Sequence, residues 1–115
     1  VGSWITIGHP TIAEIMAALR ANPPESIAGG RVERYRDLVG EGADQEGLPR
    51  SNVLTWWLDK GERVVLRPSG TEPKLKIYLE ARAQVREGSN VESARAAAGA
   101  RLDELASWAK ALVEA

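Results

Sequence analysis

Apolar positions recur every three or four residues in two stretches of the chain, one near each end. The first stretch holds Ile12, Ile15, Met16 and Leu19, and the last holds Val91, Ala94, Ala98, Leu102, Leu105, Ala109 and Leu112. This spacing is typical of amphipathic helices with one buried face. Capping-box patterns at 11–14 and 89–92 mark where each would begin. The sequence therefore predicts an early helix of about three turns and a final one of about six.

Between these stretches the apolar positions alternate with a period of two, which predicts strands. The clearest case runs from Lys74 to Arg82, where every second residue is apolar and the intervening ones are mostly charged. Further strands are expected at 31–39, 53–58 and 62–67, with a hairpin turn at 59–61. The predicted fold class is α+β: a two-layer domain with a mostly antiparallel sheet of four to five strands and two helices, in the order β-α-β4-α.

Residues 1–10 fit this scheme less clearly than the rest of the chain. The β-prone run 3–7 is followed by Gly8, His9 and Pro10, which break it. A short first strand and a leftover expression segment are both compatible with the pattern. We therefore treat 1–10 as a separate N-terminal segment and 11–115 as the domain. His9, the only histidine, is interpreted as a loop residue.

Composition narrows the classes of function. The chain has 115 residues, which suits one domain, and its 15 basic and 16 acidic side chains leave a net charge of −1. A neutral chain favours neither a nucleic-acid nor a membrane partner. The absence of cysteine removes disulfides and thiolate zinc sites. No run approaches the ~20 apolar residues of a membrane span, and the start does not resemble a signal peptide, so we expect a cytoplasmic location.

The segment from Arg67 to Lys76 carries the most suggestive chemistry. Arg67 offers a planar fork that suits phosphate oxygens. Ser69 and Thr71 add hydroxyl groups, Gly70 permits backbone N–H groups to converge on an anion, and Lys74 and Lys76 follow. Between residues 62 and 82, five basic and three acidic side chains leave a local charge of +2. From the residues alone, an anion site and an ordinary Pro-Ser-Gly turn remain open alternatives.

The run Arg67-Pro-Ser-Gly-Thr-Glu-Pro-Lys74, followed by Leu75-Lys-Ile-Tyr-Leu-Glu-Ala81, resembles the phosphate-binding loop of the α-D-phosphohexomutases. The segment 48–58 also resembles the bacterial phosphoglucomutase/phosphomannomutase branch of this family. The strong match covers about residues 48–82 and extends loosely over most of the chain. The resemblance implies the TBP-like fold of the family's C-terminal domain.

The resemblance also implies a function. In this family the C-terminal domain holds the phosphate that is not transferred while a phosphoserine in another domain exchanges its phosphoryl group with the sugar. By position, Arg67, Ser69 and Thr71 would bind phosphate through side chains and Gly70 through its N–H. Lys76 is the best candidate for a further basic contact. The implied ligand is a hexose phosphate, and the implied protein partners are the other three domains.

The sequence lacks the catalytic parts of such an enzyme. We find no match to the nucleophilic serine motif or the sugar-reading loop, and aspartates are scattered singly, so neither a catalytic residue nor a metal site is expected in this chain. Mg²⁺ and a sugar bisphosphate activator are implied only for the parent enzyme. The alternative interpretation is a free-standing module that binds a phosphorylated ligand, and preference for glucose or mannose stays open.

The remaining aromatic and charged residues have simpler interpretations. One of Trp56 and Trp57 is expected in the core and the other on a sheet face or at a domain contact, rather than on a base-stacking surface. Tyr78 should lie beside Lys76 on the polar side of its strand. Charged positions of the final helix are interpreted as a solvated face: Arg95, Arg101, Asp103, Glu104 and Lys110.

Overall fold

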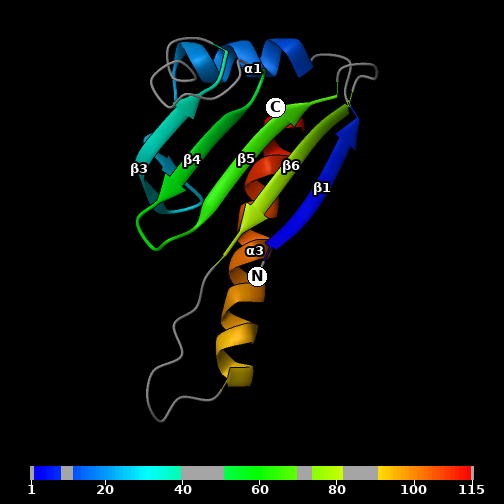
Figure 1. Cartoon of the computed structure of the whole chain (residues 1–115). Coiled ribbons are helices and arrows are strands. Elements are labelled where there is room, and N and C mark those ends of the chain that lie inside the picture. Colours follow the sequence, from blue (N-terminus) through cyan, green and yellow to red (C-terminus); the bar gives the residue numbers. More distant parts are fainter. Residues whose placement is uncertain (1, 9–11, 40–50, 70–73, 82–90, 115) are drawn as a thin grey trace.

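The protein consists of one antiparallel sheet with helices against it (Figure 1). The computed structural model describes residues 2–8, 12–39, 51–69, 74–81 and 91–114. The strands are β1 (Gly2–Gly8), β2 (Ser26–Ile27), β3 (Gly30–Asp37), β4 (Leu54–Leu58), β5 (Arg63–Pro68) and β6 (Lys74–Glu80). The helices are α1 (Ile12–Ala21) and α3 (Val91–Glu114). The sheet order is β1-β6-β5-β4-β3-β2.

The α+β prediction is confirmed, but the sheet has six strands rather than four to five. The missed strand β2 spans only Ser26–Ile27 and pairs with β3 through a tight turn at Ala28 and Gly29. Two residues are too few for a period of two to be recognised. Residues 2–8, which had two interpretations, form the edge strand β1 and pair with β6 along their whole length.

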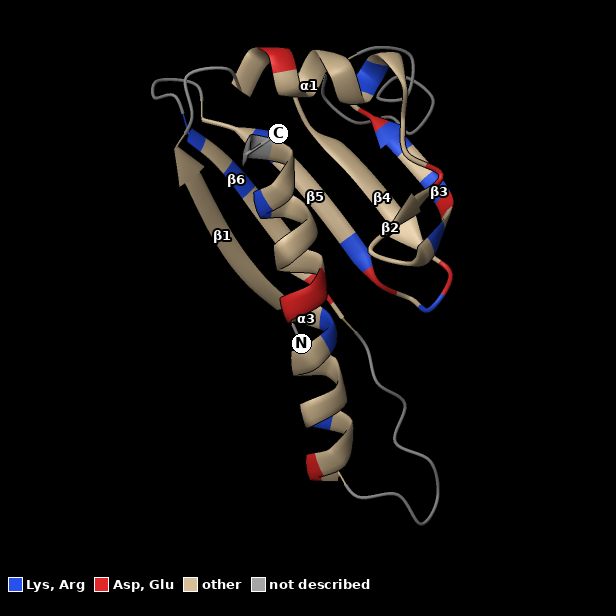
Figure 2. Ribbon diagram, turned by 180° about the vertical axis from the view of Figure 1, so that it is seen from behind, with Lys and Arg blue, Asp and Glu red and all other residues tan. Residues whose placement is uncertain are grey.

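The core lies between the sheet and the helices. On the helix side of the sheet, alternate strand residues such as Trp56, Leu66 and Ile77 are fully buried. Figure 2 shows α3 running across this face, while α1 lies over one end of the sheet. Trp56 stacks on Tyr35 and meets Trp108 of α3 edge-on, with ring centroids 5.4 and 6.3 Å away. The opposite side of the sheet, which we call the open face, is turned toward the viewer in Figure 1.

The alternation of each strand determines what the open face carries. Trp56 is the buried member of the tryptophan pair, and Trp57 lies half-buried on the open face, as predicted. Tyr78 and Lys76 also share this face, because they alternate with the buried Leu75, Ile77 and Leu79. The open face therefore carries the polar side chains that alternate with the buried residues of these strands.

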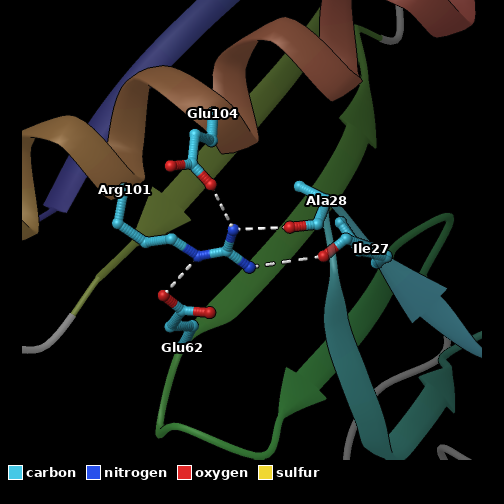
Figure 3. A network of polar contacts seen from close by, with 5 residues as sticks. All are labelled: Ile27, Ala28, Glu62, Arg101 and Glu104. Atoms are coloured by element: carbon cyan, nitrogen blue, oxygen red, sulfur yellow. Dashed lines mark hydrogen bonds and ion pairs between the residues drawn. The ribbon is translucent and has the colours of Figure 1, made fainter.

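The solvated face predicted for the final helix is wrong at one position. Arg95, Asp103, Glu104 and Lys110 are exposed, but the Arg101 side chain is only 18% exposed. Its guanidinium group bonds Glu62, a carboxylate in the β4–β5 connection that is 2% exposed (Figure 3). Helical periodicity placed Arg101 outside the apolar stripe, and only the packing of α3 against β2 and the β4–β5 hairpin buries it.

No helix among the described residues is long and apolar enough to cross a membrane.

Candidate phosphate-binding site

The β5–β6 hairpin positions the residues that the sequence singled out. Its strands pair antiparallel, with Pro68 opposite Leu75 and Arg67 opposite Lys76. The Ser69 N–H donates to the Lys74 carbonyl at 2.8 Å and closes the ladder just before the loop. Leu66, Leu75 and Ile77 are buried and anchor both strands in the core. The loop therefore projects from a rigid base, which is how proteins hold a binding loop in place.

Three side chains form a row across the open face at this end of the sheet. Arg67 of β5 lies opposite Lys76 of β6, and Lys76 lies opposite Thr6 of β1. All three residues are exposed. Directly opposed residues on an antiparallel pair have Cβ atoms about 5 Å apart, so both cations can reach one anion of phosphate size. The structure thus brings together Arg67 and Lys76, which are nine residues apart in sequence.

Among the described residues, no acidic side chain pairs with the cations of this row, Arg67 and Lys76. Glu80, the acidic residue of β6, lies at the other end of the hairpin and pairs with Arg63 at 3.0 Å. Like charges directly opposite one another destabilise a sheet. An anion bound between Arg67 and Lys76 would convert that repulsion into two favourable contacts.

The described part of the loop is its first residue, Ser69. It lies two residues after Arg67 and is half-buried. Gly70 and Thr71, the other two predicted contacts, lie outside the described residues. The described residues therefore form the base of the site: one guanidinium, one ammonium and one hydroxyl group at the mouth of a hairpin. Such groups bind a tetrahedral oxyanion through charge-assisted hydrogen bonds.

Sequence reasoning missed Thr6 as a neighbour of this site. Its hydroxyl-bearing side chain lies beside Lys76 because β1 pairs with β6 in the register that joins Gly8 to Lys74. The signal was present in the β-prone run 3–7, but the pattern of one short segment does not indicate which strand it pairs with.

One of the scattered aspartates, Asp37, has a structural role. Asp37 pairs with Arg20 at 3.0 Å and accepts a hydrogen bond from the Val39 N–H. Within the described ranges, no group of three His, Asp or Glu side chains could hold a metal ion. His9 and Asp44 lie outside those ranges. The described donor set therefore suits an anion rather than a cation.

Comparison with known proteins agrees with the resemblance carried by the loop. A family model described as phosphoglucomutase/phosphomannomutase, C-terminal domain, matches residues 14–98. A probable phosphomannomutase of Haemophilus influenzae is 45% identical over 71 residues, which cover 62% of this chain and 13% of that protein. A phosphoglucomutase of Staphylococcus aureus is 39% identical over 80 residues, which cover 63% of this chain and 14% of that protein. No solved structure matches.

Proposed function

The chain belongs to the family of phosphoglucomutase/phosphomannomutase C-terminal domains, and on that premise we propose that it binds the non-transferred phosphate of a hexose phosphate within a longer mutase. The chain corresponds to only 13–14% of the length of the relatives named above, so the catalytic activity is assigned to the parent protein. In this proposal the domain clamps the substrate while the phosphoryl group moves elsewhere, and it has no catalytic residue of its own.

The observation that carries the proposal is the pairing of Arg67 with Lys76 at the mouth of the β5–β6 loop. Two cations in direct opposition repel each other, and an anion bound between them would relieve that repulsion. Ser69 supplies a neutral donor at the same place, and we assign Gly70 and Thr71 to the same phosphate by their position in the loop. A site centred on the phosphate accepts either end of a sugar bisphosphate, which suits a mutase intermediate that must turn around.

The remaining parts of the reaction are proposed to lie in the parent enzyme. Mg²⁺, the sugar bisphosphate activator and the nucleophile would be supplied by the other three domains, since the described acidic residues do not gather into a metal site. A charged hexose phosphate does not partition into a bilayer, so we place the activity in the cytoplasm. In this proposal the described residues of the site contact the phosphate and leave recognition of the sugar to the other domains.

Titration of the isolated chain with inorganic phosphate tests the binding step. We expect a Kd in the millimolar range, because one phosphate makes few contacts, with amide shifts centred on residues 67–76. The variant Arg67→Gln should weaken binding about tenfold or more through loss of a charge-assisted contact. Arg95→Gln, which removes the same charge from the exposed side of α3, should leave it unchanged. Shifts spread evenly over the chain would contradict a site at the loop.

In the complete mutase, Arg67→Ala should lower kcat/KM by about 10- to 100-fold, as expected for loss of a bidentate charged contact. A parent enzyme with unaltered kinetics would remove this residue from the site. The alternative, a free-standing module for a phosphorylated ligand, would be favoured if the chain bound phosphate at Arg67 but the complete protein had no mutase activity.

A further inference from the structure

An exposed tryptophan lies on the open face beside the phosphate site. Trp4 of β1 is 63% exposed, the largest exposed fraction among the large apolar side chains that the structure describes. Its neighbour across the β1–β6 pairing is Tyr78, and the next row of the open face toward the loop holds Thr6 and Lys76. Side chains two residues apart on a strand share one face of the sheet and are about 7 Å apart. Trp4 therefore lies one row from the base of the phosphate site.

The Tyr78 ring supports Trp4 in a defined orientation. The two ring centroids are 5.0 Å apart, and the ring planes meet at 56°. Tyr78 is itself held in place, because its hydroxyl group donates to Glu80 at 3.3 Å and the Arg63 guanidinium carbon lies 5.3 Å from its ring centroid. Gly2 leaves the space that this ring occupies, since a Cβ there would overlap the Tyr78 hydroxyl group. The Trp4 indole is therefore an exposed aromatic surface on a rigid support.

An indole in this position suits the ring of a sugar phosphate. The faces of a pyranose ring carry C–H groups, which pack against the negatively charged face of an aromatic ring, while the hydroxyl groups lie at the rim. Small-molecule sites commonly combine an aromatic wall with a few polar groups that fix the orientation of the ligand. Here Arg67 and Lys76 are the polar groups and Trp4 is the wall. One row of the sheet, about 7 Å, is of the order of the distance from a phosphate to the far side of its hexose ring.

The strand that carries Trp4 favours a neutral occupant over a charged one. All seven residues of β1 are uncharged. An acidic or basic protein surface would find no charged partner on this strand, whereas the ring of a hexose needs none. The charge of a hexose phosphate lies on its phosphate, which the neighbouring row binds in the function proposed above. One molecule can therefore satisfy both rows at once.

We propose that Trp4 is a platform on which the sugar ring of a hexose phosphate stacks while its phosphate is held at Arg67 and Lys76. The inference rests on the proposed function and deepens it with a contact to the ring. Stacking does not distinguish one hydroxyl arrangement from another, so recognition of the hydroxyl groups stays with the other domains. A contact of this kind also tolerates both orientations of a sugar bisphosphate. Trp4 lies outside residues 14–98, which the family model matches.

Separate titrations of the isolated chain with glucose 6-phosphate and with inorganic phosphate test the platform. Glucose 6-phosphate should shift the Trp4 indole N–H and bind about fivefold tighter than phosphate, because it covers the exposed indole face. Phosphate should shift residues 67–76 and leave the Trp4 indole unmoved. In Trp4→Ala the two ligands should bind equally, with the Kd for phosphate unchanged. The matched control Val91→Ala removes an exposed apolar side chain from α3 and should keep the fivefold difference.

The aromatic face, and not the fold of β1, should account for the difference. Trp4→Phe keeps an aromatic ring, so glucose 6-phosphate should still bind at least about twofold tighter than phosphate. An unaltered chain that binds both ligands equally, or that shows no shift of the Trp4 indole, would refute the platform alone. Absence of any shift at 67–76 with either ligand would refute the phosphate site. Tighter binding of uridine 5′-phosphate than of glucose 6-phosphate would assign the indole to a nucleobase and overturn the proposal.

Hydroxyl-radical footprinting of the complete mutase distinguishes a substrate platform from a surface covered by another domain. Without ligand, Trp4 should be oxidised as fast as in the isolated chain. Saturating glucose 6-phosphate should slow this oxidation severalfold, while Trp108, which packs against the core, should be unaffected. Protection of Trp4 before ligand is added would mean that another domain covers it, and the proposal would be overturned.

Discussion

At the scale of single residues, Arg101 shows how one charged side chain can fix the relation between helix and sheet. Its Nε donates to Glu62 at 2.7 Å, and its terminal nitrogens donate to Glu104 and to the carbonyls of Ala28 and Ile27 (Figure 3). The hydrogen bond to Glu62 is the main reason that the pKa of Arg101 is raised. A Cβ on Gly30 would lie 2.9 Å from the Arg101 guanidinium, so the glycine makes room for it. Helix α3, the β2–β3 hairpin and the β4–β5 connection thus meet at one guanidinium group.

Arg101→Met tests this role. Removing the cation leaves the nearly inaccessible Glu62 carboxylate without its charged partner, and breaking a buried ion pair in this way costs about 3 kcal/mol or more. The free energy of unfolding, measured with urea, should fall by that amount. Arg95→Met on the exposed side of α3 should cost less than about 0.5 kcal/mol.

A double variant separates lost charge from lost packing. In Arg101→Met/Glu62→Met no buried charge is left alone, so much of the stability should return. If Arg101→Met unfolded at the same urea concentration as Arg95→Met, the contacts of Arg101 would not contribute to stability.

At the scale of elements, the β2–β3 turn is where backbone strain is located. Ala28 has φ +48° and Gly29 has φ +82°, so two consecutive residues are left-handed, as tight hairpins require. Glycine adopts this conformation without cost, whereas alanine pays about 1 kcal/mol or more. The Ala28 carbonyl accepts a hydrogen bond from Arg101, which helps to hold the strained residue in place.

Ala28→Gly should therefore raise the free energy of unfolding by about 0.5 kcal/mol, because relief of strain exceeds the added entropy of the unfolded chain. Ala28→Val should lower it by more than about 1 kcal/mol, since a β-branched residue tolerates positive φ poorly. The same substitution at a helical position, Ala97→Gly on α3, should instead lower the free energy of unfolding by about 1 kcal/mol. Thermal unfolding of the three variants measures these changes. If Ala28→Gly were less stable than the parent, Ala28 would not be strained.

The elements that the sequence predicted well are those with long periodic patterns. Both helices and strands β3–β6 lie within a few residues of their expected bounds, and β4, β5, β6 and the helices each carry a periodic set of buried residues. The two-residue β2 and the pairing of β1 with β6 were beyond reach, since neither is encoded in a local period. The same limit applies to the site: loop chemistry indicated Arg67 and Lys76, whereas their direct opposition and the neighbouring Thr6 follow from strand register.

At the scale of the whole molecule, a near-neutral chain separates its charges by face. Arginine and lysine side chains of β3, β5 and β6 lie on the open face in two places, around Trp57 and at Arg67 and Lys76, while the helix side of the sheet is apolar. A net charge of −1 therefore describes neither face. Anions that bind only the folded chain relieve this separation, so they should stabilise the molecule as a whole.

Phosphate should show this coupling directly. With a Kd of about 10 mM, 50 mM phosphate raises the free energy of unfolding by about 1 kcal/mol relative to chloride at equal ionic strength. The gain should vanish in Arg67→Gln/Lys76→Gln, which lacks both cations opposed at the loop. It should persist in Arg34→Gln/Arg36→Gln, which removes two cations of β3, away from the loop. Urea unfolding of the three chains in matched buffers measures the difference. If phosphate raised the free energy of unfolding equally in all three chains, it would act through general salt effects and not at the loop. Only a site at Arg67 and Lys76 makes this increase depend on those two residues.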